Sequence, residues 1–598
     1  MRANKGQEGP IPPTGKIKGN IASRLSFFPI WYTLRQYSWA KAKGDMQSAV
    51  NTFFIDFPQS MAYAMVANLP IQFGLYSAIV ASFVCPIFAS KHLMMMMGPT
   101  TATSILTLST FLSLNFSPEQ TLFALPILVF MVGILLILGA FFGLSGLSRY
   151  VSRSVTVAYL TAVILLIILN QFGVALGCKI PKASTFMEML QMTCLNLHKA
   201  HWPTIVLSLS TAAVYFNLKK YCPRLPLVGT TLIIMAVVAK GMNQLGASFQ
   251  MAEAASCTGW DFTWPVWDWD LIRTLGQPAI ALALVITLDS ANIAKTLASQ
   301  SPGRPDLNQQ MLSMGITNIA SAVTSGMVVS GSLMRSQLNI AGGAKTVISS
   351  ISSGLILLFC FLVLSPYFQY IPKPTLSVLI IIISVPLIRV DMIKMLISST
   401  VGDAVVFFLT FFLGLVLNLE SSIYIGAAIS IIFFLKKVSV PQLLEYDFND
   451  SGELCEKSRK DTTTPEISIV HVEGDLFFGA ADIFLDQTFL ILEEPNLKVI
   501  ILRLRNAHHL DASTIIAIKE LLEFAREKKR EVIICDVLPE IEVIFRNSGL
   551  IQHLGEDNFF SYVSPNPNWS TREALKRAQV LIGAEHSKIK LFISSNEA

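Results

Sequence analysis

Charged residues are scarce in this sequence of 598 residues. Asp, Glu, Lys and Arg together make up 14% of it, whereas soluble proteins carry about 25%. The scarcity is greatest between about residue 50 and about residue 434, where apolar runs follow one another. This excludes a soluble globular protein and predicts a polytopic membrane protein. The last 160 or so residues have mixed charges and short alternating segments, which indicate a soluble domain.

Signatures of several other protein classes are missing. The eight cysteines show no paired metal-binding spacing, and the chain has no glycine-rich nucleotide loop or nucleophile–base arrangement that would indicate an enzyme. We therefore expect no enzyme activity, no cofactor, no metal and no nucleic-acid partner. Residues 1–48 lack the apolar core of a signal peptide. Their mixture of aromatic and basic residues predicts a segment at the cytoplasmic membrane interface, with a mobile tail as the alternative.

Hydropathy divides the chain into four parts. Residues 1–48 precede a membrane domain over 49–437, which is followed by a linker, 438–463, and a cytoplasmic domain with a tail, 464–598. The membrane domain contains about fourteen apolar spans. These spans are 49–66, 71–89, 98–113, 121–143, 154–176, 203–217, 227–243, 277–297, 309–325, 331–341, 345–365, 373–389, 401–418 and 421–436.

Basic residues indicate the orientation of these spans. If the chain starts on the cytoplasmic side, most Lys and Arg residues between spans fall on that side, as the positive-inside rule predicts. The long loop 244–275 carries four acidic residues and a single arginine and falls outside. Lys179, Lys182 and Lys199 are exceptions. Both termini are then expected in the cytoplasm.

Several of the spans fall short of the roughly 20 residues that one helix needs to cross a bilayer, and two of these are informative. One begins at GPTTATS (98–104) and the other within SGSLMRSQLN (330–339). If the fourteen spans form two sets of seven, each of these short spans is the third in its set. Because seven is odd, the two sets cross the membrane in opposite orientations and form an inverted repeat. Their N-termini would meet near the midplane, where unpaired N–H groups and helix dipoles attract an anion. Two Gly/Ser kinks between packed helices are the alternative.

Longer motifs give the sequence a family resemblance. FPQSMAYAMVANLPIQFGLYSA (57–78), GPTTATS, LDSANIAKTLASQ and SGSLMRSQLNIAGGAKT occur in this order and resemble the sulfate permease (SulP) family of anion transporters. The resemblance implies a seven-plus-seven inverted repeat with core and gate subdomains, followed by a small α/β STAS domain, and usually a homodimer. It also implies that the two short helices hold the substrate anion.

The same resemblance assigns site residues. The positions that would bind the anion are Gln59, Thr100, Thr101, Gly331, Ser332 and Arg335. Gln59 can donate from a neutral amide, and the other positions begin the two short helices. Arg335 matches a basic residue common in the family, but it could equally pair structurally or extend toward the membrane interface.

Asp289 is the candidate residue for coupling transport to a cation. An ionised carboxylate is costly within the run ALALVITLDSANIA, and the matching family position commonly holds an acid. A proton could neutralise it, or a sodium ion could balance it; the residue one turn on, Ile293, offers no oxygen and disfavours sodium. Lys295 is expected at the interface. Asp56 stands where the family has an apolar residue and is either a second protonation site or an ion-pair partner.

The C-terminal part predicts a small α/β domain. ISIVHVEG, VIILRL and EVIICDV are strand-like, and DASTIIAIKELLEFAREKK is an amphipathic helix. LRLRNAHHLDASTIIAI resembles the STAS core, with Asp511 as helix cap. Ala512 occupies the position of the serine that is phosphorylated in soluble relatives, which disfavours such a switch.

The sequence thus predicts a secondary active transporter of an inorganic anion. The favoured hypothesis is proton-coupled uptake of sulfate by elevator-like alternating access. A bicarbonate or chloride exchanger, with sodium as the coupling ion in some cases, is the alternative. An uncoupled channel or a voltage-driven motor also remains open, although an acid at position 289 favours coupling.

Overall fold

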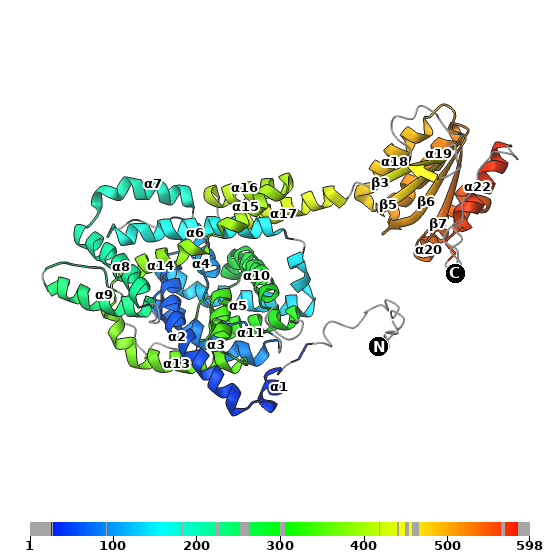
Figure 1. Ribbon diagram of the computed structural model, residues 1–598. Helices are drawn as coiled ribbons and strands as arrows, with labels where there is room; N and C mark the ends of the chain where they lie inside the picture. The colour runs from blue at the N-terminus through cyan, green and yellow to red at the C-terminus, as the bar shows by residue number, and fades with distance from the viewer. Residues whose placement is uncertain are drawn as a thin grey trace, which may run out of the picture. The chain divides into compact units, whose positions relative to one another are not determined.

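The computed structural model describes most of the chain. It covers residues 25–583 except for 27, 91–92, 150, 179, 181–182, 184, 223–226, 245, 252–261, 263, 299–304, 418, 439–441, 449–453, 457–465 and 564–568. Residues 1–24 of the predicted N-terminal segment therefore lie outside the described residues, as do Lys179 and Lys182. The chain forms two compact units, Met1–Ser430 and Ile431–Ala598, which are shown in Figure 1 and described separately here.

The first unit is helical and repeats one order of elements twice. The first half comprises α1 (Ile30–Arg35), α2 (Trp39–Val66), α3 (Ile71–Phe88), β1 (Met97–Gly98), α4 (Thr101–Ser113), α5 (Pro118–Phe141), α6 (Arg153–Ala175), α7 (Phe186–Asn196), α8 (Trp202–Tyr221) and α9 (Leu227–Gln244). The second half comprises α10 (Trp269–Ala298), α11 (Leu307–Val323), β2 (Ser330–Gly331), α12 (Leu333–Ala341), α13 (Ile348–Leu364), α14 (Lys373–Ser384), η6 (Val385–Leu387), α15 (Val390–Ser399), α16 (Val401–Val416) and α17 (Leu419–Val438).

A helix coincides with every predicted span, and the α-helical class is confirmed. Seven helical segments within the described residues are long and apolar enough to cross a membrane on their own. The two short spans correspond to α4 and α12, and each follows a two-residue strand. The structure adds α7 and α15, which apolar length did not predict, and begins the first membrane helix ten residues early, at Trp39.

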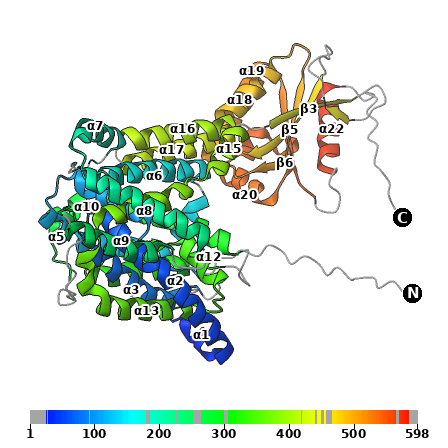
Figure 2. The same cartoon turned by 60° about the vertical axis from the view of Figure 1, so that its left-hand side comes forward.

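Packing sorts these helices into two groups. One group, called here the core helices, consists of α2, α3, α4, α5, α10, α11, α12 and α13, and the other, the gate helices, consists of α6, α7, α8, α9, α14, α15 and α16. Contacts within each group are far denser than those between the groups. Within the gate helices, α6 and α16 lie side by side in both views (Figures 1 and 2).

The second unit is an α/β domain built on one six-stranded sheet. The strands are β3 (Gln442–Phe448), β4 (Leu454–Glu456), β5 (Ile467–Asp475), β6 (Val499–His508), β7 (Glu531–Val537) and β8 (Phe559–Ser561), in the order β4-β3-β5-β6-β7-β8. β5 to β8 run parallel, and β3 is antiparallel to β5. The helices are α18 (Phe478–Leu492), α19 (Ala512–Glu527), α20 (Pro539–Asn547), α21 (Leu550–Leu554) and α22 (Trp569–Ile582).

Alternating side chains of the strands pack into two separate apolar cores. Val470, Leu502 and Ile534 pack in one core with the buried side chains of α18 and α19, whereas Ile501 and Ile533 pack against α22. The three predicted strands and the helix after Asp511 are confirmed. Asp511 caps α19 by accepting a 3.1 Å hydrogen bond from the Thr514 N–H. The range predicted as a linker, 438–463, instead contains β3 and β4, because β5 offers an edge on which β3 can pair.

Candidate functional site

The two short helices begin with capping hydroxyls. Thr100 lies in an extended conformation before α4, and its Oγ1 accepts from the Thr103 N–H at 3.4 Å. Ser332 does the same for α12, accepting from the Arg335 N–H at 3.4 Å. Each cap satisfies the third N–H of its helix. The first two N–H groups of each helix, at Thr101 and Ala102 and at Leu333 and Met334, have no carbonyl within their own helix to bind.

A short antiparallel pairing holds the segments that lead into these helices. Met97 of β1 pairs with Gly331 of β2, and Gly98 pairs with Ser330. The Ser332 N–H adds a 2.9 Å hydrogen bond to the Met96 carbonyl. The N-termini of α4 and α12 are thereby fixed on either side of one cavity.

That cavity has a volume of about 370 Å³ and lies between the core and gate helices. Its wall includes six residues that the sequence proposed for the site, namely Gln59, Thr100, Thr101, Asp289, Gly331 and Ser332. All six belong to the core helices and their connecting strands. Facing residues come from α6 and from the segment that joins η6 to α15.

Arg335 and Asp56 lie behind this wall. Both side chains are buried, with 0% and 1% of their surface exposed, and Arg335 Nη1 is 3.0 Å from Asp56 Oδ1. Arg335 Nε donates to Gln59 Oε1 at 3.1 Å, and its Nη2 donates to the Pro99 carbonyl at 2.7 Å. Arg335 is therefore not among the described residues that line the cavity, where the family resemblance had placed it as an anion ligand. The geometry favours structural pairing over extension to the membrane interface.

Asp289 projects from α10 into the cavity and is partly exposed there. Ile293, Asn292 and Thr296, from the next turns of α10, line the same wall. Arg389 is near enough to act electrostatically on the Asp289 carboxyl. No cluster of three or more His, Cys, Asp or Glu suited to a metal occurs among the described residues.

Sequence reasoning missed the cations of the cavity. Arg153 at the start of α6, Arg389 before α15 and Lys295 on α10 all line it. The charge pattern placed all three near the cytoplasmic ends of their spans, but no signal in the sequence shows that they face inward. Together they add positive charge to the cavity, and Arg389 acts on the Asp289 carboxyl.

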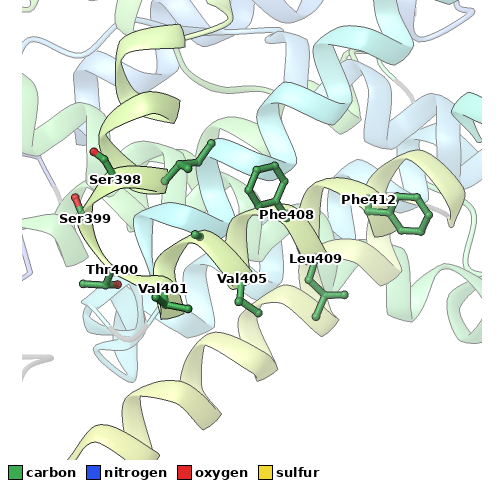
Figure 3. A pocket seen from close by; sticks show the side chains of 10 residues that line it. Ser398, Ser399, Thr400, Val401, Val405, Phe408, Leu409 and Phe412 are labelled. Carbon is green, nitrogen blue, oxygen red and sulfur yellow. The ribbon is translucent and has the colours of Figure 1, made fainter.

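A second hollow, of about 640 Å³, is chemically different (Figure 3). It lies where α15 turns into α16 and is lined mainly by apolar side chains, among them Val405, Phe408 and Phe412. None of the described residues that line it is charged. An anion would find no compensating charge there, so the candidate site is the cavity at the helix ends.

Comparison with known proteins shows the family to which the chain belongs. The sulfate permease family matches residues 43–410, and the STAS domain matches residues 459–564. The chain therefore belongs to the sulfate permease family. It is a multi-pass membrane transporter of inorganic anions with a C-terminal STAS domain, and it is not an enzyme.

Individual relatives are distant but cover most of the chain. "Sulfate transporter 4.1, chloroplastic" of Arabidopsis thaliana is 24% identical over 564 residues, which span 90% of this chain and 81% of the relative. The inward-facing structure of murine Solute Carrier 26 family member A9 superimposes with a TM-score of 0.81 at 18% identity, covering 96% of this chain and 97% of that one. The transmembrane domain of the cyanobacterial bicarbonate transporter BicA gives a TM-score of 0.56 at 17% identity, covering 66% and 98%.

Proposed function

We propose that this protein takes up sulfate together with protons. The observation that carries the proposal is that one cavity contains both the N-termini of α4 and α12 and the carboxyl group of Asp289. The helix ends supply backbone N–H groups and roughly one positive charge in total. They attract the anion, while the acid beside them provides a place for the proton.

The charges of the cavity explain why a proton would be needed. Sulfate and an ionised Asp289 would together bring three negative charges into a site partly shielded from water. The helix ends offset about one of them, and the nearby cations offset part of the rest. A proton on Asp289 removes one negative charge when the anion binds, so the anion and the proton favour each other's binding.

The division into two packed groups supports alternating access. Asp289 and both helix ends belong to the core helices, whereas Arg153 and Arg389 stand on the gate side. Movement of the core helices as one body past the gate helices would carry the whole site across the membrane, as in an elevator. We place both termini in the cytoplasm, as the placement of basic residues indicates, and expect a homodimer, as the family resemblance implies.

Exchange of bicarbonate or chloride is the second candidate function. Backbone N–H groups recognise charge and size rather than a particular oxyanion. The similarity in fold to a cyanobacterial bicarbonate transporter is consistent with either substrate.

Uptake into proteoliposomes distinguishes these functions. Labelled sulfate, bicarbonate and chloride are each offered under an imposed pH gradient, an imposed sodium gradient, or neither. Sulfate accumulation that requires only the inward proton gradient supports the proposal. Accumulation driven by sodium, or flux that needs an anion on the opposite side, supports the second candidate. Passive flux of all anions would indicate an uncoupled channel.

A further inference from the structure

The arginine in the first turn of α12 has its own counter-ion. Arg335 lies in the first turn of α12, three residues after Ser332, and its guanidinium is in contact with Asp56. Asp56 is on α2, one turn before Gln59, and the Ser60 hydroxyl donates to its Oδ1 at 3.0 Å. The ion pair is thus built from both the helix that carries Gln59 and the helix that presents Ser332.

Burial makes this pairing strong and specific. An isolated charge in a dry interior is costly, so each member of the pair depends on the other. The guanidinium is also fixed by Gln59 and by the Pro99 carbonyl, and its Nη1 packs so close to Gly98 that a side chain at that position would collide with it. These contacts keep Arg335 behind the cavity wall.

The pair changes the charge that an anion meets. A free guanidinium in the first turn of α12 would add a full positive charge to the roughly one supplied by the helix ends. With Asp56 at 3.0 Å, the two side chains present a short dipole instead. Within the described residues, the second oxygen, Asp56 Oδ2, is buried without a hydrogen-bond partner. The negative charge on that oxygen is therefore not reduced by a hydrogen bond from a described residue.

We propose that Asp56 sets the selectivity of the site between divalent and monovalent anions by cancelling the charge of Arg335. Asp56 is a positioning residue that acts through Arg335 and does not contact the anion. The inference rests on the proposed anion site between α4 and α12 and adds to it the residue that limits its charge. With the ion pair intact, Arg335 adds little to the positive charge of the helix ends and of the cations that line the cavity. A divalent anion therefore gains less than it would from a free arginine.

Charge-altering variants test this inference. Asp56→Asn leaves Arg335 uncompensated and should tighten sulfate binding at least about tenfold more than chloride binding, because an added charge acts twice as strongly on a divalent anion. Arg335→Gln leaves Asp56 uncompensated, so it should weaken sulfate binding more than chloride binding and lower the ratio of sulfate affinity to chloride affinity. The double variant removes both charges, and its sulfate-to-chloride ratio should return to within about twofold of the wild-type value.

Asp45→Asn is the matched control. Asp45 is equally buried on α2, but it accepts from the Lys345 and Thr346 N–H groups at 2.6 and 3.0 Å and not from Arg335. Its loss should lower thermal stability and leave the anion ratio unchanged. If Asp45→Asn changed the sulfate-to-chloride ratio as much as Asp56→Asn does, the effect would reflect disrupted packing and the proposal would fail.

The measurement is competition binding of labelled sulfate against unlabelled chloride to the purified full-length protein at fixed pH. Wild-type protein that binds no anion would contradict the proposed function, whereas wild-type binding with an unmoved ratio in Asp56→Asn would contradict this inference alone. Single variants that bury an unpaired charge are the ones most prone to misfold. The double variant buries none, and a ratio clearly different from wild type in that variant is sufficient to reject the inference.

Discussion

Gly98 and Ser330, which belong to opposite halves of the membrane unit, are paired in a two-residue antiparallel bridge. Each lies just before the N-terminus of a short helix, so the bridge fixes the two helix ends relative to each other. The neighbouring backbone is buried and tightly packed: a side chain at Gly331 would meet Met95 Sδ at 2.6 Å. A preformed site of this kind binds an anion without first ordering a loop.

A carboxylate placed at the helix ends should compete with the substrate. In Ser332→Glu the new side chain would sit at the N-terminus of α12, where a negative charge is favourable. We expect the protein to fold and the affinity for sulfate to fall about a hundredfold or more. Ser332→Ala is the control, with a loss of about 1 kcal/mol in stability from the missing cap and a smaller change in affinity. Equal affinities in Ser332→Glu and wild type would exclude these helices as the site.

Neutralising Asp289 should separate binding from energy coupling. Asp289→Asn mimics the protonated acid, so anion binding and anion-for-anion exchange should persist. Accumulation of sulfate in response to an inward proton gradient should disappear. Asp289→Glu, which keeps the titrating group, should retain some gradient-driven uptake. Uptake by Asp289→Asn with the wild-type pH profile would leave Asp56 as the remaining candidate for the proton.

Removal of the second unit should leave the anion site intact, because none of the cavity residues belongs to it. Deletion from residue 464 would leave β3 without its partner β5, so truncation after Val438 is the cleaner experiment. We expect the truncated protein to bind sulfate with an affinity within a few-fold of the full chain, while assembly or transport rate changes. Complete loss of binding in correctly inserted protein would contradict this division.

The STAS domain should lose stability in mild acid. Burial and the neighbouring Arg503 guanidinium lower the pKa of His471 on β5 from 6.5 to about 4. The folded domain therefore binds fewer protons than the unfolded chain between these values, and its free energy of unfolding falls as the pH drops from about 6.5 to about 4. Because His471 is only half-buried, we expect a loss of about 1–2 kcal/mol.

Urea unfolding of the domain from residue 439 onward, which has its own apolar cores, would measure this loss. His471→Gln should show a smaller decrease between pH 7 and pH 4.5 than the wild-type domain. The same decrease in both would show that other groups cause the acid sensitivity.

Apolar length was enough to predict the fourteen spans of the membrane unit, but not α7, α15 or the early start of α2 at Trp39. The GPTTATS and SGSLMRSQLN segments were informative because Ser and Thr are typical helix caps. Thr100 and Ser332 do cap α4 and α12. Strands β3 and β4 were missed, since β3 is fixed by pairing with β5 across a gap in the sequence, which no local pattern reveals.

The charged residues of the site were harder to predict than the helix ends. The sequence placed Asp56 and Arg335 in different spans and gave no sign that they lie 3.0 Å apart. Likewise, the positions of Arg153 and Arg389 in the wall of the cavity that contains Asp289 depend on how the gate helices pack against the core helices. Such relationships come from tertiary packing and not from periodicity.

The position of the bound anion can be measured directly with selenate, a heavier analogue of sulfate that gives an anomalous X-ray signal. In crystals of the full-length protein with selenate, we predict one selenium peak between the N-termini of α4 and α12, within hydrogen-bonding reach of the first N–H groups of both helices. A peak confined to the surroundings of Arg153 and Lys295, with none between the two helix ends, would contradict the account.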